Sequence, residues 1–311
     1  MTTSDIADIR IAGAPISWGV CEVPGWGYQM ASERVLSEMR DAGLTATEIG
    51  PKGFLPVDPR ELAATLERHH LECVGGFAPV LLHHAQHDPV PGIAPLLDAF
   101  VASRAEVLVL AAATGLDGYD SRPELDDAQW DTLLENLDRM QEAGAERKVR
   151  VVLHPHVGTV VEKREEVDRV LEGSAIPLCL DTGHLLIGGT DPLELVEGHA
   201  NRITHVHLKD VDSALAARVR GGELTYTDAV AEGMYTRLGT GDVDIAGVVN
   251  GLLDVDYDGW FVLEQDTVLV SEPTGAGPVA EVIACAEYLR SVVDSRRRPG
   301  HRAAYRAGAR S

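Results

Sequence analysis

Imidazole and carboxylate groups recur at the ends of short apolar segments in this sequence. Five such segments, each with the composition of a buried strand, end in or carry Glu48, His154-Pro-His156, Asp181-Thr-Gly-His184, His205-Val-His207-Leu-Lys209 and Glu264. Neutral imidazoles and carboxylates together are the ligands of a divalent cation with mixed nitrogen and oxygen coordination. A single His at a strand end is more often only hydrogen-bonded. The convergence of five segments is what predicts a metal site.

The predicted ligands come one each from four successive segments: His154, Asp181, His207 and Glu264. His205 and His207 point to the same side of their strand, because side chains alternate with period two. His184 follows Asp181 by three residues across a turn, so both side chains can approach one pocket. We therefore expect His184 to contact substrate or to orient a ligand.

The elements that must position these groups alternate between strand and helix. Strands are expected at residues 9–16, 45–49, 72–77, 107–111, 149–153, 177–180, 203–208 and 260–263, with amphipathic helical patterns between them. Nearly continuous apolar strands between such helices indicate a parallel sheet that is buried on both faces. Eight repeats in 311 residues predict an α/β fold of the (β/α)8 TIM-barrel type. A doubly wound open sheet is the alternative, although no Gly-x-Gly-x-x-Gly follows the first strand.

The predicted barrel is a single domain that spans residues 1–295, and two segments lie outside its repeat. Residues 210–241 form an unusually long connection, and connections of that length are usually functional lids or disordered. Glycines at 221–222 and at 239 and 241 could act as hinges, so we expect this insert to close over the pocket. Residues 296–311 are basic and poor in large apolar side chains, which predicts a mobile tail.

Charge and composition exclude several classes of protein. The chain has 27 Lys and Arg against 49 Asp and Glu, a net charge of −22. Such a field repels phosphate backbones and anionic lipid, so we expect neither a nucleic-acid nor a membrane partner. No apolar run approaches the roughly 18 residues of a membrane span, and the N-terminus lacks the pattern of a secretory signal.

The cysteines point to the compartment. The four of them are scattered and form no Cys-x-x-Cys pair: Cys21, Cys73, Cys179 and Cys285. This pattern favours free thiols in a reducing cytoplasm over a disulfide framework or a zinc knuckle. Self-association into a homo-oligomer is left open.

Two groups of motifs are distinctive. The first is Leu180-Asp-Thr-Gly-His184, His205-Val-His-Leu-Lys-Asp210, Leu238-Gly-Thr-Gly-Asp-Val-Asp244 and Val262-Leu-Glu264. It resembles the second half of the sugar phosphate isomerase/epimerase-like TIM barrels, the superfamily of xylose isomerase and endonuclease IV. The second is Ala14-Pro-Ile-Ser-Trp-Gly19, Thr47-Glu-Ile-Gly50, Gly53-Phe-Leu-Pro56 and Leu153-His-Pro-His-Val-Gly-Thr159. It is similar to the inosose dehydratases of myo-inositol catabolism, and the resemblance covers residues 9–290.

The resemblance also bears on the metal. In the superfamily the ion is held by Glu, Asp, His and Glu from the last four strands, and Asp181, His207 and Glu264 match the last three. His154 stands where the epimerases place a Glu. Two carboxylates and two neutral imidazoles leave the ion less neutralised, and therefore a stronger Lewis acid. The nitrogen ligands favour Mn²⁺ or Co²⁺, with Zn²⁺, Fe²⁺ and Mg²⁺ as alternatives.

The resemblance implies a lyase. The expected reaction is dehydration of a small polyol ketone, an inosose such as 2-keto-myo-inositol, by removal of the α-proton and loss of the β-hydroxyl. An isomerase or epimerase that acts on a ketose or sugar phosphate shares the first half of this chemistry and is the alternative. Four ligands on four strands oppose an inactive binding module. The negative charge opposes a nuclease like endonuclease IV.

Proton transfer is assigned to three residues, His184, Lys209 and Glu48. An imidazole, an amine or a carboxylate near a divalent cation can be tuned towards neutrality, as general acid–base catalysis requires. Two of them have an alternative, purely structural role. Glu48 could support a metal ligand or the barrel rim, and Lys209 could form an ion pair with Asp210 without taking part in catalysis.

Substrate contact is assigned to one histidine and two aromatic residues. His156 is expected to hydrogen-bond a substrate hydroxyl, or else Asp181. Trp18 and Phe54 are expected to line the pocket, although aromatic residues near barrel mouths are often plain packing.

Overall fold

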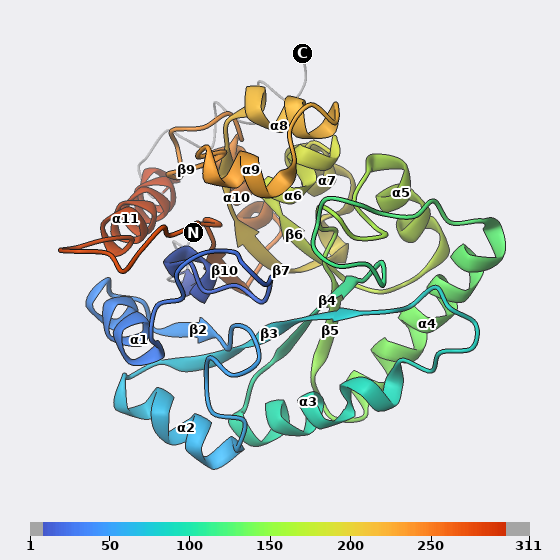
Figure 1. The fold of residues 1–311 in the computed structure, drawn as a ribbon, viewed down its shortest axis with the longest axis horizontal. Coiled ribbons are helices and arrows are strands. Elements are labelled where there is room, and N and C mark those ends of the chain that lie inside the picture. The colour runs from blue at the N-terminus through green and yellow to red at the C-terminus, as the bar shows by residue number, and fades with distance from the viewer. Residues whose placement is uncertain (1–8, 297–311) are drawn as a thin grey trace, which may run out of the picture.

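The computed structural model describes residues 9–296, and these residues form a closed barrel of eight parallel strands (Figure 1). The strands are β1 (Arg10–Gly13), β2 (Ala46–Glu48), β3 (Glu72–Val80), β4 (Val107–Ala112), β5 (Arg150–Leu153), β6 (Leu178–Asp181), β7 (Ile203–Leu208) and β10 (Trp260–Leu263). Around the barrel their order is β1-β10-β7-β6-β5-β4-β3-β2. The prediction of a single-domain TIM barrel is confirmed, and the open sheet is excluded.

Helices surround the barrel on the outside (Figure 1). They are α1 (Ser32–Asp41), α2 (Pro59–Arg68), α3 (Val90–Ser103), α4 (Asp127–Ala145), α5 (Arg164–Gly173), α6 (Thr182–Gly188), α7 (Pro192–His199), α10 (Ile245–Asp254) and α11 (Val279–Arg296). Two short 3-10 helices, Pro15–Trp18 and Ala200–Arg202, lie in the connections. Several helices begin where the sequence places a capping residue or a proline. For example, α7 begins at Pro192, and the Asp191 carboxylate caps it by accepting the Leu193 N–H.

Two kinds of core hold the strands in place. Alternate strand residues point into the barrel, where small and β-branched side chains such as Ala12, Ala46, Val74 and Val262 pack together. The outward-facing residues pack against the helices, and every residue of β4 is buried. Burial on both faces explains the nearly continuous apolar strands of the sequence. All four cysteines lie within residues 9–296, and all four are free thiols.

The insert at residues 210–241 is folded. It forms β8 (Asp210–Val211), α8 (Ser213–Arg220), α9 (Tyr226–Ala231) and β9 (Tyr235–Thr236), and β8 pairs with β9 antiparallel. Helix α8 packs against α6, and both insert helices lie beside α6 and α7 in Figure 1. The long connection is therefore an ordered part of the protein, with helices and strands of its own. Its closure over a substrate stays a prediction.

One buried carboxylate closes the insert. The two side-chain oxygens of Asp210 accept four backbone N–H groups, those of Val211 at 2.9 Å, Gly239 at 2.8 Å, Gly241 at 3.0 Å and Val243 at 3.1 Å. A Cβ added at Gly241 would lie 2.3 Å from Asp210 Oδ1, so this position requires glycine. The Leu238–Asp244 motif is thus a loop wrapped around Asp210.

Replacing Asp210 by Ala should lower the free energy of unfolding by about 3 kcal/mol or more, because hydrogen bonds to a charged acceptor contribute about 1.5–3 kcal/mol each. Urea denaturation measures the change. Asp228→Ala, on the exposed side of α9, is the matched control and should change stability little. Equal stability of the two variants would contradict a structural role for Asp210.

Within residues 9–296, none of the helices has both the length and the apolar character needed to cross a membrane. The predicted tail at 296–311 lies outside the described residues except for its first member. Arg296 belongs to α11, where its guanidinium donates to the Asn250 carbonyl and to Asp254.

Candidate metal and substrate site

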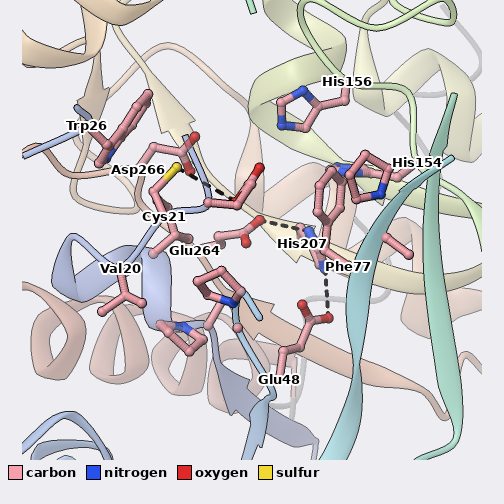
Figure 2. A pocket seen from close by; sticks show the side chains of 18 of the residues that line it. Val20, Cys21, Trp26, Glu48, Phe77, His154, His156, His207, Glu264 and Asp266 are labelled. Carbon is pink, nitrogen blue, oxygen red and sulfur yellow. Dashed lines mark hydrogen bonds and ion pairs between the residues drawn. The ribbon is translucent and has the colours of Figure 1, made fainter. Parts of the chain in front are cut away.

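A cavity of about 340 Å³ opens at the ends of the barrel strands (Figure 2). The strands deliver polar side chains to it from their carboxyl ends, as a TIM barrel requires. Six of the residues predicted from the sequence line it: Glu48, His154, His156, His207, Lys209 and Glu264. The strand-end pattern of the sequence therefore does describe one site in space.

Three predicted metal ligands form a compact group. Asp181, His207 and Glu264 each offer a ligand atom, and these atoms lie within 4.8 Å of one another. His207 Nδ1 is 2.8 Å from Glu264 Oε2 and 3.6 Å from Asp181 Oδ2. The other oxygen of Asp181 caps α6 by accepting the N–H groups of Gly183 and His184 at 2.9 and 2.8 Å. This cap orients the carboxylate and leaves Oδ2 for the site.

The fourth predicted ligand lies on one side of this group. His154 Nε2 is 3.2 Å from Asp181 Oδ2, and the ring is buried. His154 forms ligand-distance groups with Asp181 and His184, and with Cys179 and His207. Among residues 9–296 no such group joins it to Glu264.

The atoms that converge here fit a divalent cation. His207 Nδ1 and Glu264 Oε2 are both buried and lie 2.8 Å apart, and within the described part of the chain neither has a hydrogen-bond partner outside this cluster of ionisable groups. Buried polar atoms almost always have such partners, so each exception requires an explanation. Burial raises the pKa of Glu264, but His207 and Lys209 outweigh it and lower the pKa to about 2, so the group is a carboxylate. An imidazole nitrogen beside carboxylate oxygens is a ligand set for a transition-metal ion.

Lys209 lies beside the same carboxylates. Its Nζ is 2.7 Å from Asp266 Oδ1, 3.1 Å from Glu264 Oε2 and 3.4 Å from Asp181 Oδ2. Burial lowers the pKa of this amine, but the three carboxylates outweigh burial and raise the pKa well above its ordinary value. Lys209 is therefore an ammonium. The ion pairs of Lys209 are with these three carboxylates and not with Asp210, whose carboxylate instead accepts hydrogen bonds from the insert loop.

His184 and His156 lie next to Lys209 as a stacked pair, with ring centroids 3.7 Å apart. Burial lowers the pKa of both rings well below the ordinary value, so both are neutral. His184 Nε2 is 3.0 Å from Lys209 Nζ and accepts a hydrogen bond from it, because an ammonium only donates. His156 Nδ1 donates to the Val157 carbonyl at 2.6 Å, which leaves His156 Nε2 as an acceptor.

Glu48 lies on the far side of His207 from Glu264 (Figure 2). Its Oε1 is 2.9 Å from His205 Nε2 and 3.0 Å from His207 Nε2. Burial raises the pKa of Glu48, but the two histidines outweigh burial and hold the pKa well below its usual range. Glu48 is thus an ionised carboxylate buried between two imidazoles.

The two predicted aromatic contacts have different outcomes. Trp18 is fully buried, and its indole N–H donates to Glu38 Oε2 on α1 at 2.7 Å. Trp26 is the tryptophan that lines the cavity instead. Phe54 lines an adjoining hollow, which shares with the site cavity the residues Val20, Cys21, Glu22, Pro51 and Lys52.

The sequence patterns assigned no role to Asp266, which lines the cavity, or to Tyr226, which contacts Asp266. Asp266 follows Glu264 by two residues, so strand-end periodicity could have identified it. Tyr226 comes from the insert, and its hydroxyl donates to Asp266 Oδ2 at 2.5 Å and lies 3.0 Å from the Tyr235 hydroxyl. Its backbone N–H donates to Asp120 Oδ1 at 2.8 Å, which ties the insert to the loop after β4. No sequence pattern marked Tyr226.

Comparison with known proteins identifies relatives of this chain. Residues 36–287 match the family described as xylose isomerase-like TIM barrel. An inosose dehydratase from Geobacillus kaustophilus (strain HTA426) is 33% identical over 297 residues, which cover 91% of this chain and 94% of the relative. The rhizopine catabolism protein MocC from Rhizobium meliloti is 34% identical over 286 residues, which cover 89% of this chain and 86% of the relative.

Solved structures support the fold. The IOLI protein, in a structure with a bound zinc atom, superposes with a TM-score of 0.69 at 13% identity, covering 92% of this chain and 99% of its own. An L-ribulose 3-epimerase has a TM-score of 0.67 at 16% identity, covering 93% and 96%. The chain therefore belongs to the xylose isomerase-like TIM barrel family, as an enzyme similar to the inosose dehydratases.

Proposed function

We propose that this protein is a metal-dependent hydro-lyase that dehydrates a cyclic polyol ketone, an inosose such as 2-keto-myo-inositol. The observation that carries the proposal is the convergence of Asp181, His207 and Glu264 beside the ammonium of Lys209. This arrangement combines a site for a Lewis acid with a proton donor in one cavity. The relatives named inosose dehydratase supply the substrate class.

The metal would be held by Asp181, His207 and Glu264, with His154 completing the set. When bound, a divalent cation polarises a carbonyl and makes the adjacent C–H more acidic. Because two of the four ligands are imidazoles, we propose Mn²⁺ or Co²⁺, with Zn²⁺, Fe²⁺ and Mg²⁺ as alternatives.

We assign both proton transfers to Lys209 and His184. The pair holds an acidic and a basic site 3.0 Å apart, an ammonium and a neutral imidazole. One member takes the proton α to the carbonyl, and the pair returns a proton to the departing β-hydroxyl, which leaves as water. The C–H and C–O bonds break as the C=C bond forms, and the pair ends the turnover with as many protons as it began with.

His156 is the proposed contact for a substrate hydroxyl. Its Nε2 is the acceptor nitrogen, because its Nδ1 donates to the Val157 carbonyl. Its ring packs between His184 and Tyr119, with centroid distances of 3.7 and 4.6 Å. Phe54 would contact only those parts of a substrate that extend into the adjoining hollow.

Incubation of the metal-loaded protein with 2-keto-myo-inositol in D₂O should yield a product lighter by one water, with near-ultraviolet absorbance from a conjugated enol or dione. Mass spectrometry follows both the water loss and the deuterium uptake, and a panel of free ketoses is run beside it. An epimerase or isomerase would exchange the α-proton and keep every oxygen. Inversion or isomerisation of a ketose, with no water lost from the inosose, would therefore replace the dehydratase assignment.

A further inference from the structure

A buried carboxylate crosses the barrel to reach the metal-ligating strand. Glu48 is the last residue of β2 and is 3% exposed. Strand β2 does not pair with β7, because β1 and β10 lie between them in the barrel order. Glu48 nevertheless contacts both histidines of β7 through its Oε1, at 2.9 Å from His205 Nε2 and 3.0 Å from His207 Nε2.

These contacts determine where the imidazole protons lie. Both Nε2 atoms lie at hydrogen-bond distance from a single carboxylate oxygen, so each imidazole donates its Nε2–H to Glu48. With Nε2 engaged in this way, Nδ1 is the nitrogen of His207 that can bind an ion. His207 Nδ1 is the atom that points to Glu264 Oε2, as Figure 2 shows, and to Asp181 Oδ2. One contact therefore presents the coordinating nitrogen of His207 to the proposed metal.

The second histidine, His205, anchors the Glu48 carboxylate. His205 Nδ1 is buried and has no hydrogen-bond partner among the described residues. Among residues 9–296 the hydrogen bond of the His205 side chain is thus the one from Nε2 to Glu48. Two donors on one carboxylate oxygen hold that oxygen against His207. Glu48 groups with His205 and His207 at ligand distances, whereas Asp181 and Glu264 group on the Nδ1 side of His207.

We propose that Glu48 is a positioning residue, which, anchored by His205, holds His207 in the tautomer and orientation that bind the metal through Nδ1. This assignment replaces a direct part for Glu48 in proton transfer. It rests on the proposed function only in taking the metal as the one that the reaction uses. Binding of the ion alone can be measured without any substrate.

Glu48→Gln is the decisive variant, because it keeps the shape of the side chain and removes its charge. Titration of metal-free protein with Co²⁺ should show a Kd raised by about 10–100-fold, the usual effect of losing a hydrogen-bond partner behind a metal ligand. At saturating Co²⁺ the kcat should return to near the wild-type value. Glu38→Gln is the matched control, because Glu38 accepts from Trp18 and Arg34 and lies outside the cavity.

A second measurement reports on the protons themselves. In ¹⁵N-histidine-labelled protein loaded with diamagnetic Zn²⁺, the His207 nitrogen shifts should show Nε2 protonated and Nδ1 bound to the ion, and Glu48→Gln should shift that population. Circular dichroism confirms that the variant is folded.

The outcomes separate the roles. An unchanged Kd for Co²⁺, or a kcat that stays low at saturating metal, would overturn the proposal and return Glu48 to acid–base catalysis. Coordination of Zn²⁺ through His207 Nε2 in the wild type, with the proton on Nδ1, would also overturn it. If wild-type protein binds Co²⁺ as expected but dehydrates no inosose, the proposed function fails and the assignment of Glu48 stands.

Discussion

Glu264→Gln should remove the divalent cation and lower kcat/KM by on the order of 10³-fold, because Lewis-acid stabilisation is worth several kcal/mol. The amide keeps the size of the side chain but loses the negative charge. The buried Oε2, whose neighbours among residues 9–296 include His207 Nδ1 and Lys209 Nζ, is the atom that would bind the ion. Elemental analysis of the purified protein and steady-state kinetics measure the two effects.

Glu272→Gln is the matched control for this change, because the Glu272 side chain is 66% exposed and its carboxylate forms an ion pair with Arg34 at 3.6 Å. It should keep both metal and activity. His207→Ala and Asp181→Ala should also lose the ion while staying folded. Full metal content in any of the three variants would remove that residue from the ligand set.

Lys209→Met should act in the opposite direction on the metal. Its kcat should fall by about 10²–10⁴-fold, the usual contribution of a positioned proton donor. Its affinity for Co²⁺ should rise, because the ammonium no longer competes for Asp181 and Glu264. A lower kcat together with a higher affinity for Co²⁺ would show that Lys209 acts on the reaction rather than by holding the ion.

The same variant should show a stability that depends on metal. Without an ion, loss of the ammonium leaves buried carboxylates unpaired, which costs on the order of 3–5 kcal/mol. Added Co²⁺ should recover most of that loss, measured as Tm with and without metal. Lys148→Met is the control, because Lys148 is exposed in the turn before β5. Equal metal affinity of Lys209→Met and wild type would contradict the competition.

The architecture could be predicted because each repeat carries its own signal. Apolar strands such as Val107–Ala112 and amphipathic helices such as Asp127–Ala145 are local patterns, and parallel strands end at one rim. That rule alone placed Glu48, His207 and Glu264 in one cavity. The first strand is shorter than predicted, since Pro15 begins a 3-10 helix directly after β1.

The orientations of the side chains within the site could not be predicted from the sequence. Trp18 and Trp26 lie in the same loop, and only the packed structure shows that the indole of Trp18 turns to Glu38 while Trp26 faces the cavity. Tyr226 reaches Asp266 because α9 folds back over the barrel, a tertiary event with no local pattern. Glu48 was identified as a site residue, but its contact with a non-adjacent strand, which defines its part, is visible only in three dimensions.

The clamp at Asp210 makes residues 211–239 an exchangeable module. The chain leaves the barrel at Asp210 and returns through Gly239, Gly241 and Val243, and all of these backbone groups meet on one carboxylate. What lies between them can change in length and sequence while the barrel keeps its closure. Since Tyr226 of this module donates to Asp266, which lines the cavity, a lineage or a designer can reshape substrate preference by grafting a new segment at two neighbouring junctions. The metal-binding strands need not be touched.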